Sequence, residues 1–151
     1  MKRILATNPN NVTALIARVA TGIAIIPHGA QKLFGWFGGN GFTGTMGFLT
    51  TGAGLPYIFA LLVILIEFFA SLFLILGFLT RISAFGMLAL FAGVVLTAHL
   101  HNGFFMNWGK EAGKGEGLEY FILLFGLILI SLIAGGGKAS IDAGIMKAKN
   151  V

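Results

Sequence analysis

Residues 55–79, LPYIFALLVILIEFFASLFLILGFL, decide the fold because they form an apolar run that a single charge, Glu67, interrupts. About 20 consecutive apolar residues suffice for an α-helix to cross the hydrocarbon core of a bilayer. Pro56 stands in the expected first turn, where its missing N–H costs nothing. The stretch therefore predicts a membrane-spanning helix with one acid near its middle.

Three further apolar stretches lie along the chain, at residues 12–34, 82–100 and about 118–134. The whole sequence is 57% hydrophobic and 10% charged, and its mean hydropathy is +0.93. A soluble domain of 151 residues would need far more charged surface. We therefore expect an all-α polytopic membrane protein, a four-transmembrane-helix bundle that forms one domain over residues 1–151.

Lysine and arginine flank the predicted spans unevenly, which predicts the orientation of the chain. One side carries Lys2, Arg3, Arg81, Lys138, Lys147 and Lys149, and the other carries Lys32, Lys110 and Lys114. Since the more basic flanks stay in the cytoplasm, both termini are predicted to be cytoplasmic. The net charge of +5 is then explained by helix ends that face anionic headgroups. The expected partner is the lipid bilayer of a bacterial inner membrane, and no nucleic acid.

Glu67 is the most informative single residue, because an acid near the bilayer midplane must be paired or protonated. A functional interpretation makes it a proton-relay or ligand-binding acid. A structural interpretation pairs it with Arg18 of the first span, which enters from the cytoplasmic side. Pro27 in that span predicts a kink beside His28. The sequence leaves both interpretations of Glu67 open.

The other polar residues of the spans gather in the predicted non-cytoplasmic half. His28, Gln31 and Lys32 share one helix face, and His99 and Asn102 share another. The candidate catalytic residues are Glu67, His28, His99 and Glu119. The candidate cofactor-binding residues are His28, Gln31, Lys32, Trp36, His99, His101 and Asn102.

Several kinds of site fit these residue types. Facing histidines on two helices ligate b-type haem, and a set of histidines and acids holds a metal or moves protons. Histidines and acids beside an apolar pocket serve a quinone, which needs proton donors near its carbonyl oxygens. A hydrogen-bond network without a ligand is the structural alternative. The chain contains no cysteine, which excludes thiolate and iron–sulfur chemistry of its own.

The connection at residues 35–54 carries no charge, so we expect it to lie in the membrane interface or to dip back into it. Its string GNGFTG, residues 39–44, has the spelling of a dinucleotide fingerprint, but no predicted strand precedes it and we reject that interpretation. Trp36, Phe37 and Trp108 are interpreted as aromatic-belt anchors, with stacking on a bound quinone as the alternative.

Five strings, in this order, resemble the DoxX family of small four-helix membrane proteins. They are HGAQKLFGWFGGNGF from His28, IEFFASLFLILGFLTR ending at Arg81, HLHNGFF from His99, GLEYFILL from Gly117, and GGGKASID ending at Asp142. The resemblance covers nearly the whole chain. It places the polar signature of the family on His28, Gln31, Lys32, Glu67, Arg81, His99, Asn102 and Glu119.

The resemblance implies an inner-membrane protein associated with redox chemistry. Some relatives are subunits of thiosulfate:quinone oxidoreductase, and others are linked to oxidative-stress complexes or to catechol and quinone resistance. Most members have no assigned activity, so the resemblance implies the fold better than the reaction. We expect a quinone-linked membrane oxidoreductase component. The alternatives are an accessory subunit of a larger membrane complex and a small-molecule or proton transporter, and the possible partners are a quinone, a membrane or redox subunit, or a second copy of the chain.

Overall fold

The computed structural model of the chain describes residues 2–148, and all regular secondary structure in this range is helical. Lys149, counted above among the basic flanks, lies outside the described residues. The elements in chain order are α1 (Lys2–Leu5), α2 (Val12–Phe34), η1 (Trp36–Gly38), α3 (Gly41–Gly47), η2 (Phe48–Gly52), α4 (Tyr57–Leu65), η3 (Ile66–Ala70), α5 (Ser71–Leu76), α6 (Thr80–Val94), η4 (Val95–His99), α7 (Glu119–Ala134) and α8 (Ile141–Ala148). η1 is a 3₁₀ turn, and η2, η3 and η4 are π-helical.

Three helices are long and apolar enough to cross a membrane. They are α2, the continuous helix Tyr57–Leu76 made of α4, η3 and α5, and the helix Thr80–His99 made of α6 and η4. They match the predicted spans at 12–34, 55–79 and 82–100 closely. α7 is also apolar but has 16 residues, or about 24 Å at 1.5 Å per residue, against a hydrocarbon core of about 30 Å. The prediction of an all-helical membrane protein is thus confirmed for the described residues.

α2 begins and ends where its sequence predicts. Oδ1 of Asn11 accepts a hydrogen bond from the Ala14 N–H at 3.0 Å and so caps the first turn. The helix continues as α-helix through Pro27 to Phe34. Gly35 then adopts a left-handed conformation with φ 76°, which stops the helix and turns the chain toward η1.

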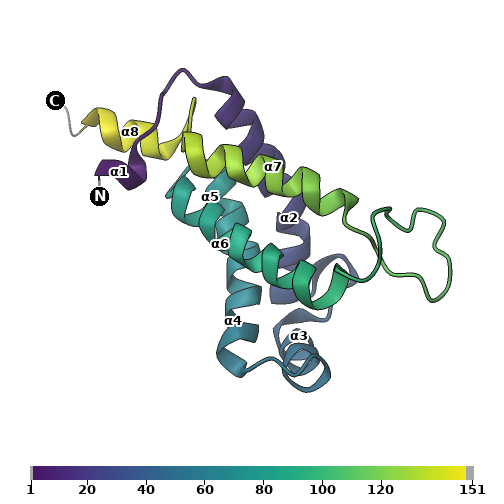
Figure 1. Ribbon diagram of the computed structural model, residues 1–151. Helices are drawn as coiled ribbons and strands as arrows, with labels where there is room; N and C mark the ends of the chain where they lie inside the picture. Colours follow the sequence, from purple (N-terminus) through teal and green to yellow (C-terminus); the bar gives the residue numbers. More distant parts are fainter. Residues whose placement is uncertain (1, 149–151) are drawn as a thin grey trace.

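α2 is the central helix of the bundle (Figure 1). It packs against α5, η3 and α7, and α7 packs against α6. α1 and α8 contact each other at the end of the bundle where α2 begins, so both termini lie at this end. η1, α3 and η2 lie at the other end of α2, below it in the view of Figure 1. We call these the terminus end and the α3 end.

Arg18 joins three segments at the terminus end. Its side chain is buried, and the guanidinium donates to five backbone carbonyls. The acceptors are the oxygens of Gly136 at 2.7 Å, Leu74 at 2.9 Å, Ile75 at 2.5 Å, Lys138 at 3.1 Å and Ala139 at 2.8 Å. Every N–H of the guanidinium is thereby used. Because none of these partners is Glu67, the structural interpretation in which Arg18 pairs with that acid is wrong.

Asp142 stabilises the connection between α5 and α6. Its carboxylate is buried and accepts hydrogen bonds from the N–H of Leu79 at 2.8 Å and of Thr80 at 2.9 Å. These N–H groups belong to the start of α6, where no helical carbonyl is available to them. The predicted spans at 55–79 and 82–100 left Thr80 and Arg81 as the turn between them. In the structure these two residues already belong to α6, and the connection is residues 77–79.

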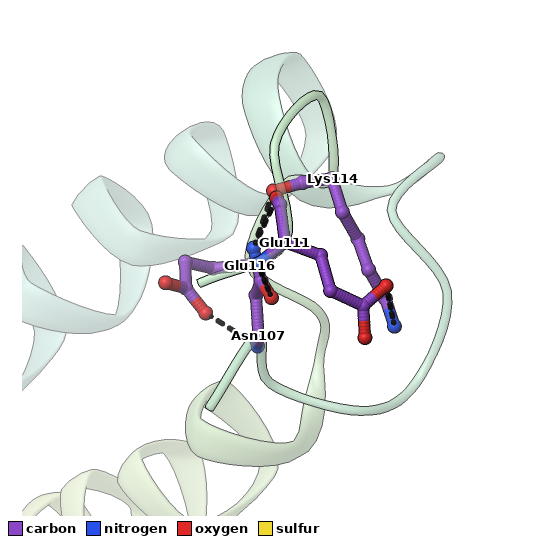
Figure 2. A network of polar contacts seen from close by, with 4 residues as sticks. All are labelled: Asn107, Glu111, Lys114 and Glu116. Carbon is purple, nitrogen blue, oxygen red and sulfur yellow. Dashed lines mark hydrogen bonds and ion pairs between the residues drawn. The ribbon is translucent and has the colours of Figure 1, made fainter. Parts of the chain in front are cut away.

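The loop at residues 100–118 projects beyond α6 and α7 (Figure 1) and is folded around the side chain of Asn107 (Figure 2). Nδ2 of Asn107 donates to the carbonyls of Glu111 at 3.1 Å and Lys114 at 2.8 Å, and Oδ1 of Asn107 accepts from the Glu111 N–H at 2.9 Å. The Asn107 N–H donates to Oε2 of Glu116 at 2.7 Å. The loop is thus internally hydrogen-bonded, while the side chains of Phe105 and Trp108 are exposed.

Candidate functional site

Glu67, in the middle of the second long helix, pairs with Lys32 near the end of α2. Oε2 of Glu67 lies 2.6 Å from Nζ of Lys32, and the two side chains are 6% and 29% exposed. The carboxylate is therefore inside the bundle, and the ammonium lies at its edge. Because an unpaired charge inside a membrane is costly, each group neutralises the other. The sequence had singled out both residues but had not paired them.

The backbone around Glu67 is held close to α2 by a glycine contact. Glu67 lies in the π-helical turn η3, and turns of this kind are frequent at functional sites. Gly29, one turn before Lys32, faces the turn so closely that a Cβ there would lie 2.7 Å from Cα of Phe68. Only glycine allows this approach, which brings Lys32 within reach of the buried acid.

The Glu67 carboxylate has few polar contacts other than that with Lys32. Among the residues that the structure describes, its buried Oε2 has no polar contact apart from the Lys32 ammonium at 2.6 Å. Buried oxygens usually have a hydrogen-bond donor. The Lys32 ammonium is the group that compensates this oxygen.

An open pocket of about 330 Å³ adjoins Lys32 at the α3 end. Its lining residues are Gln31, Lys32, Gly39, Asn40, Thr45 and Phe48. The pocket has the size of a small ligand site, which is typically about 300–1,000 Å³. It combines an ammonium, two amides and a hydroxyl with an aromatic ring, so it suits a flat molecule that carries oxygen acceptors.

His99 and Asn102 belong to a second polar group, which braces the loop at residues 100–118. Nδ1 of His99 lies 2.8 Å from the Glu116 carbonyl oxygen, and Nδ2 of Asn102 donates to the same oxygen at 3.1 Å. The His99 ring lies 4.6 Å from that of Phe121. Glu119 accepts a hydrogen bond from the Met106 N–H at 3.0 Å. The hydrogen bonds of this group hold the loop to the end of η4 and to the start of α7.

The remaining predicted site residues join neither group. His28 is exposed on α2, and His101 is exposed in the loop. Trp36 is exposed and rests on Phe34, with 5.2 Å between the ring centroids. In the described part of the chain, no three histidine, aspartate or glutamate side chains gather closely enough to hold a metal ion. The structure therefore brings together Gln31, Lys32 and Glu67, and separately His99, Asn102 and Glu119.

Two residues of the site escaped the sequence-based prediction: Asn40 and Thr45. Asn40 and Thr45 lie in and just after the string GNGFTG, which had been weighed only as a dinucleotide fingerprint. That interpretation fails in the structure too, because no strand occurs between residues 2 and 148. The sequence signal for Asn40 and Thr45 was the uncharged connection at residues 35–54, in which polar side chains belong to a segment expected to lie in the membrane interface.

Comparison with known proteins places the chain in a family but gives it no close relative. The family model described as DoxX matches residues 13–100. This range runs from the first turn of α2 to the end of η4 and includes Lys32 and Glu67, but it stops before α7, so it is shorter than the nearly complete resemblance that the sequence strings implied. No curated protein and no solved structure matches the chain.

Proposed function

This chain belongs to the DoxX family of membrane proteins, and from that premise we propose that it is a quinone-linked component of a membrane oxidoreductase. The observation that supports the proposal best is the contact of 2.6 Å between Lys32 and the buried Glu67, because Lys32 also lines the pocket at the α3 end. A quinone head group is a flat ring with carbonyl oxygens. It needs an apolar wall and a hydrogen-bond or proton donor beside an oxygen.

The residues of the pocket fit such a ligand. Phe48 offers an aromatic wall, and the Lys32 ammonium offers a charged donor to one carbonyl oxygen. Asn40 and Thr45 are further donors on the same wall. The Glu67 carboxylate, 2.6 Å from the Lys32 ammonium, holds this donor beside the pocket.

Conversion of a quinone to its quinol consumes electrons and an equal number of protons. We assign the electrons to a partner redox subunit, and the protons to this chain. Lys32 donates a hydrogen bond to one carbonyl oxygen and passes one proton to it, while the Glu67 carboxylate holds the ammonium in place. Water in the pocket returns a proton to Lys32 and supplies the second proton to the other carbonyl oxygen.

We further propose that the protein spans a bacterial inner membrane with α7 as a fourth span, and that the terminus end is cytoplasmic. The distribution of basic residues supports this orientation, since Arg81, Lys138 and Lys147 all belong to the terminus end. The pocket and both polar groups then belong to the outer half of the bundle.

Ligand binding by the purified protein in lipid nanodiscs tests the quinone site. Titration with a short-chain ubiquinone or menaquinone, followed by quenching of tryptophan fluorescence, is expected to saturate. Lys32→Met should weaken binding about tenfold, because a hydrogen bond from a charged donor contributes about 1.5–3 kcal/mol. Lys114→Met, which removes an exposed lysine from the loop, is the matched control and should bind as the unchanged protein does. Binding that does not saturate, or that Lys32→Met leaves intact, would exclude the site.

A second candidate function is that of an accessory subunit in a larger membrane complex. The loop at residues 100–118 favours it, because its exposed aromatic side chains are 53% (Phe104), 71% (Phe105) and 80% (Trp108) accessible on a hydrogen-bonded frame. Such rings are enriched in interfaces between proteins. Purification in mild detergent tests this function: a chain that migrates alone or as a homo-oligomer, with no partner subunit, would count against it.

A further inference from the structure

We propose that Lys32 and Glu67 exchange protons with one side of the membrane only. The pocket at the α3 end is the entrance, and the packing between Glu67 and Arg18 closes the path toward the terminus end. The chain would thus contain a one-sided aqueous path that stops at Glu67.

The open side of this path is polar from the pocket to the acid. Gln31, Asn40 and Thr45 line the pocket, and Lys32 connects its wall with Oε2 of Glu67 at 2.6 Å. A cavity of about 330 Å³ with polar side chains on its wall is large enough to hold water, which needs two or more polar partners. The charged group that contacts Glu67 is Lys32 from α2.

The closed side consists of close backbone contacts and buried apolar side chains. Gly22 and Gly29 bring α2 against the second long helix, and a Cβ at Gly22 would lie 2.7 Å from the carbonyl oxygen of Ser71. Ile25 and Leu74 are completely buried between these levels. Any proton that passed here would need a chain of polar groups, and these apolar side chains interrupt it.

The hydroxyl groups on the closed side do not bridge the gap. Thr21 donates to the Ala17 carbonyl at 2.9 Å, and Ser71 donates to the Glu67 carbonyl at 2.5 Å. Both hydrogen bonds remain within the donor's own helix. Beyond them, Arg18 is 1% exposed, and its guanidinium donates all of its N–H groups to backbone carbonyls. Arg18 therefore closes the terminus end.

A one-sided path determines which compartment exchanges protons with the pocket. The assignment of these protons to a quinone rests on the proposed function, whereas the path itself does not. If the pocket serves a quinone, the protons of its reduction are taken from the compartment at the α3 end, and those of quinol oxidation are released there. Charge then moves across the membrane only if the partner subunit delivers electrons from the opposite side.

Cysteine accessibility tests the path without any quinone, and the natural chain contains no cysteine that would interfere. Single variants are reconstituted or expressed in membranes and treated with a charged, membrane-impermeant methanethiosulfonate, added to right-side-out or inverted vesicles, and the modification is read by mass. Lys110→Cys in the exposed loop and Lys147→Cys on α8 mark the two sides. We expect Lys32→Cys and Gln31→Cys, both at the pocket, to be modified from the Lys110 side only, and Thr21→Cys and Ser71→Cys from neither side.

Gln31→Cys keeps the ion pair intact, so it remains informative if Lys32→Cys does not fold. Modification of position 32 or 31 from the Lys147 side, or of position 31 from neither side, would overturn the proposal. So would modification of position 21 or 71 from the Lys147 side. If the labelling pattern is as expected but the protein binds no quinone, the one-sided path stands and the proposed function is excluded. If quinone binding saturates but labelling occurs from both sides, the proposed function stands and the one-sided path is excluded.

Discussion

Lys32 and Glu67 lie 2.6 Å apart across the contact between α2 and η3, although the sequence offered Arg18 as the partner of the acid. The two basic residues occupy different levels of the same helix. Lys32 is at the α3 end, beside a pocket, and Arg18 is at the terminus end, where backbone carbonyls surround it. The bundle therefore separates a basic residue that pairs with the buried acid beside a pocket from one that binds backbone carbonyls of α5 and of the connection between α7 and α8.

Removal of one member of the Lys32–Glu67 pair should destabilise the protein strongly. Breaking a buried ion pair costs about 3–5 kcal/mol, because the remaining charge is left uncompensated. Lys32→Met should cost more than Glu67→Gln, since Lys32 is 29% exposed and its charge can reach the pocket when alone. Thermal unfolding in mild detergent measures both.

The double variant tests whether the two residues act as a pair. Lys32→Met combined with Glu67→Gln leaves no net charge, and its loss of stability should be smaller than the sum of the single losses by about 0.5–3 kcal/mol. Losses that simply add would show that the two side chains do not interact in the folded protein.

Gly29→Ala should disturb the site through the backbone. The new Cβ would meet Cα and N of Phe68 at 2.7 Å, so α2 and η3 must move apart and the reach of Lys32 to Glu67 must lengthen. We expect a loss of about 1–3 kcal/mol in the free energy of unfolding, typical of overpacking, together with weaker quinone binding. Gly93→Ala in α6 is the matched control, because nothing lies within 4 Å of its Cβ. It should be neutral or stabilising by up to about 1 kcal/mol. Equal effects of the two substitutions would remove the special role of Gly29.

Arg18→Lys should loosen the terminus end although the charge is kept. Lysine has three donors against five in arginine, so at least two of the five carbonyls lose the side chain. The Leu74 carbonyl also accepts from the Gly77 N–H at 3.2 Å, so at least one carbonyl is left without a donor, at a cost of about 1–3 kcal/mol. Limited proteolysis should then cut the segment between α7 and α8 faster. Arg81→Lys is the control, since Arg81 is less buried and donates only to the carbonyls of Ala6 and Leu132. A smaller effect at Arg18 than at Arg81 would contradict the assignment.

The sequence predicts the long helices well and the pairing of their polar residues poorly. The span at residues 12–34 matches α2 because Asn11 and Gly35 are strong local signals for a helix start and a helix end. Burial of Glu67 also follows from its place in an apolar run. Its partner does not, because Arg18 and Lys32 are both on α2 and only the packing at Gly29 decides which one reaches the acid.

The histidines show the same limit. Spacing placed His28 on one face with Gln31 and Lys32, yet His28 is exposed in the folded chain and Lys32 is at the pocket. A three-to-four-residue spacing fixes only an approximate direction around the helix. His99 was predicted at the end of a span, but its partner is a backbone carbonyl, that of Glu116, which no sequence pattern reveals. Long-range contacts to backbone atoms are the part of the site that only the structure supplies.

Asp142→Ala should unwind the start of α6 from a distance. The Asp142 carboxylate belongs to α8, and it accepts from the Leu79 and Thr80 N–H groups at 2.8 Å and 2.9 Å, which have no helical acceptor of their own. Leu79 also has a left-handed φ of 46°, a conformation that costs about 1–2 kcal/mol and needs such support. Loss of a cap typically costs about 0.5–2 kcal/mol, and hydrogen exchange of the amides at residues 79–83 should accelerate most. Asp142→Asn keeps one carboxamide oxygen as acceptor, so it should lose less than the alanine variant. If exchange rises equally in α6 and in α4, the cap is not local and Asp142 supports the bundle in another way.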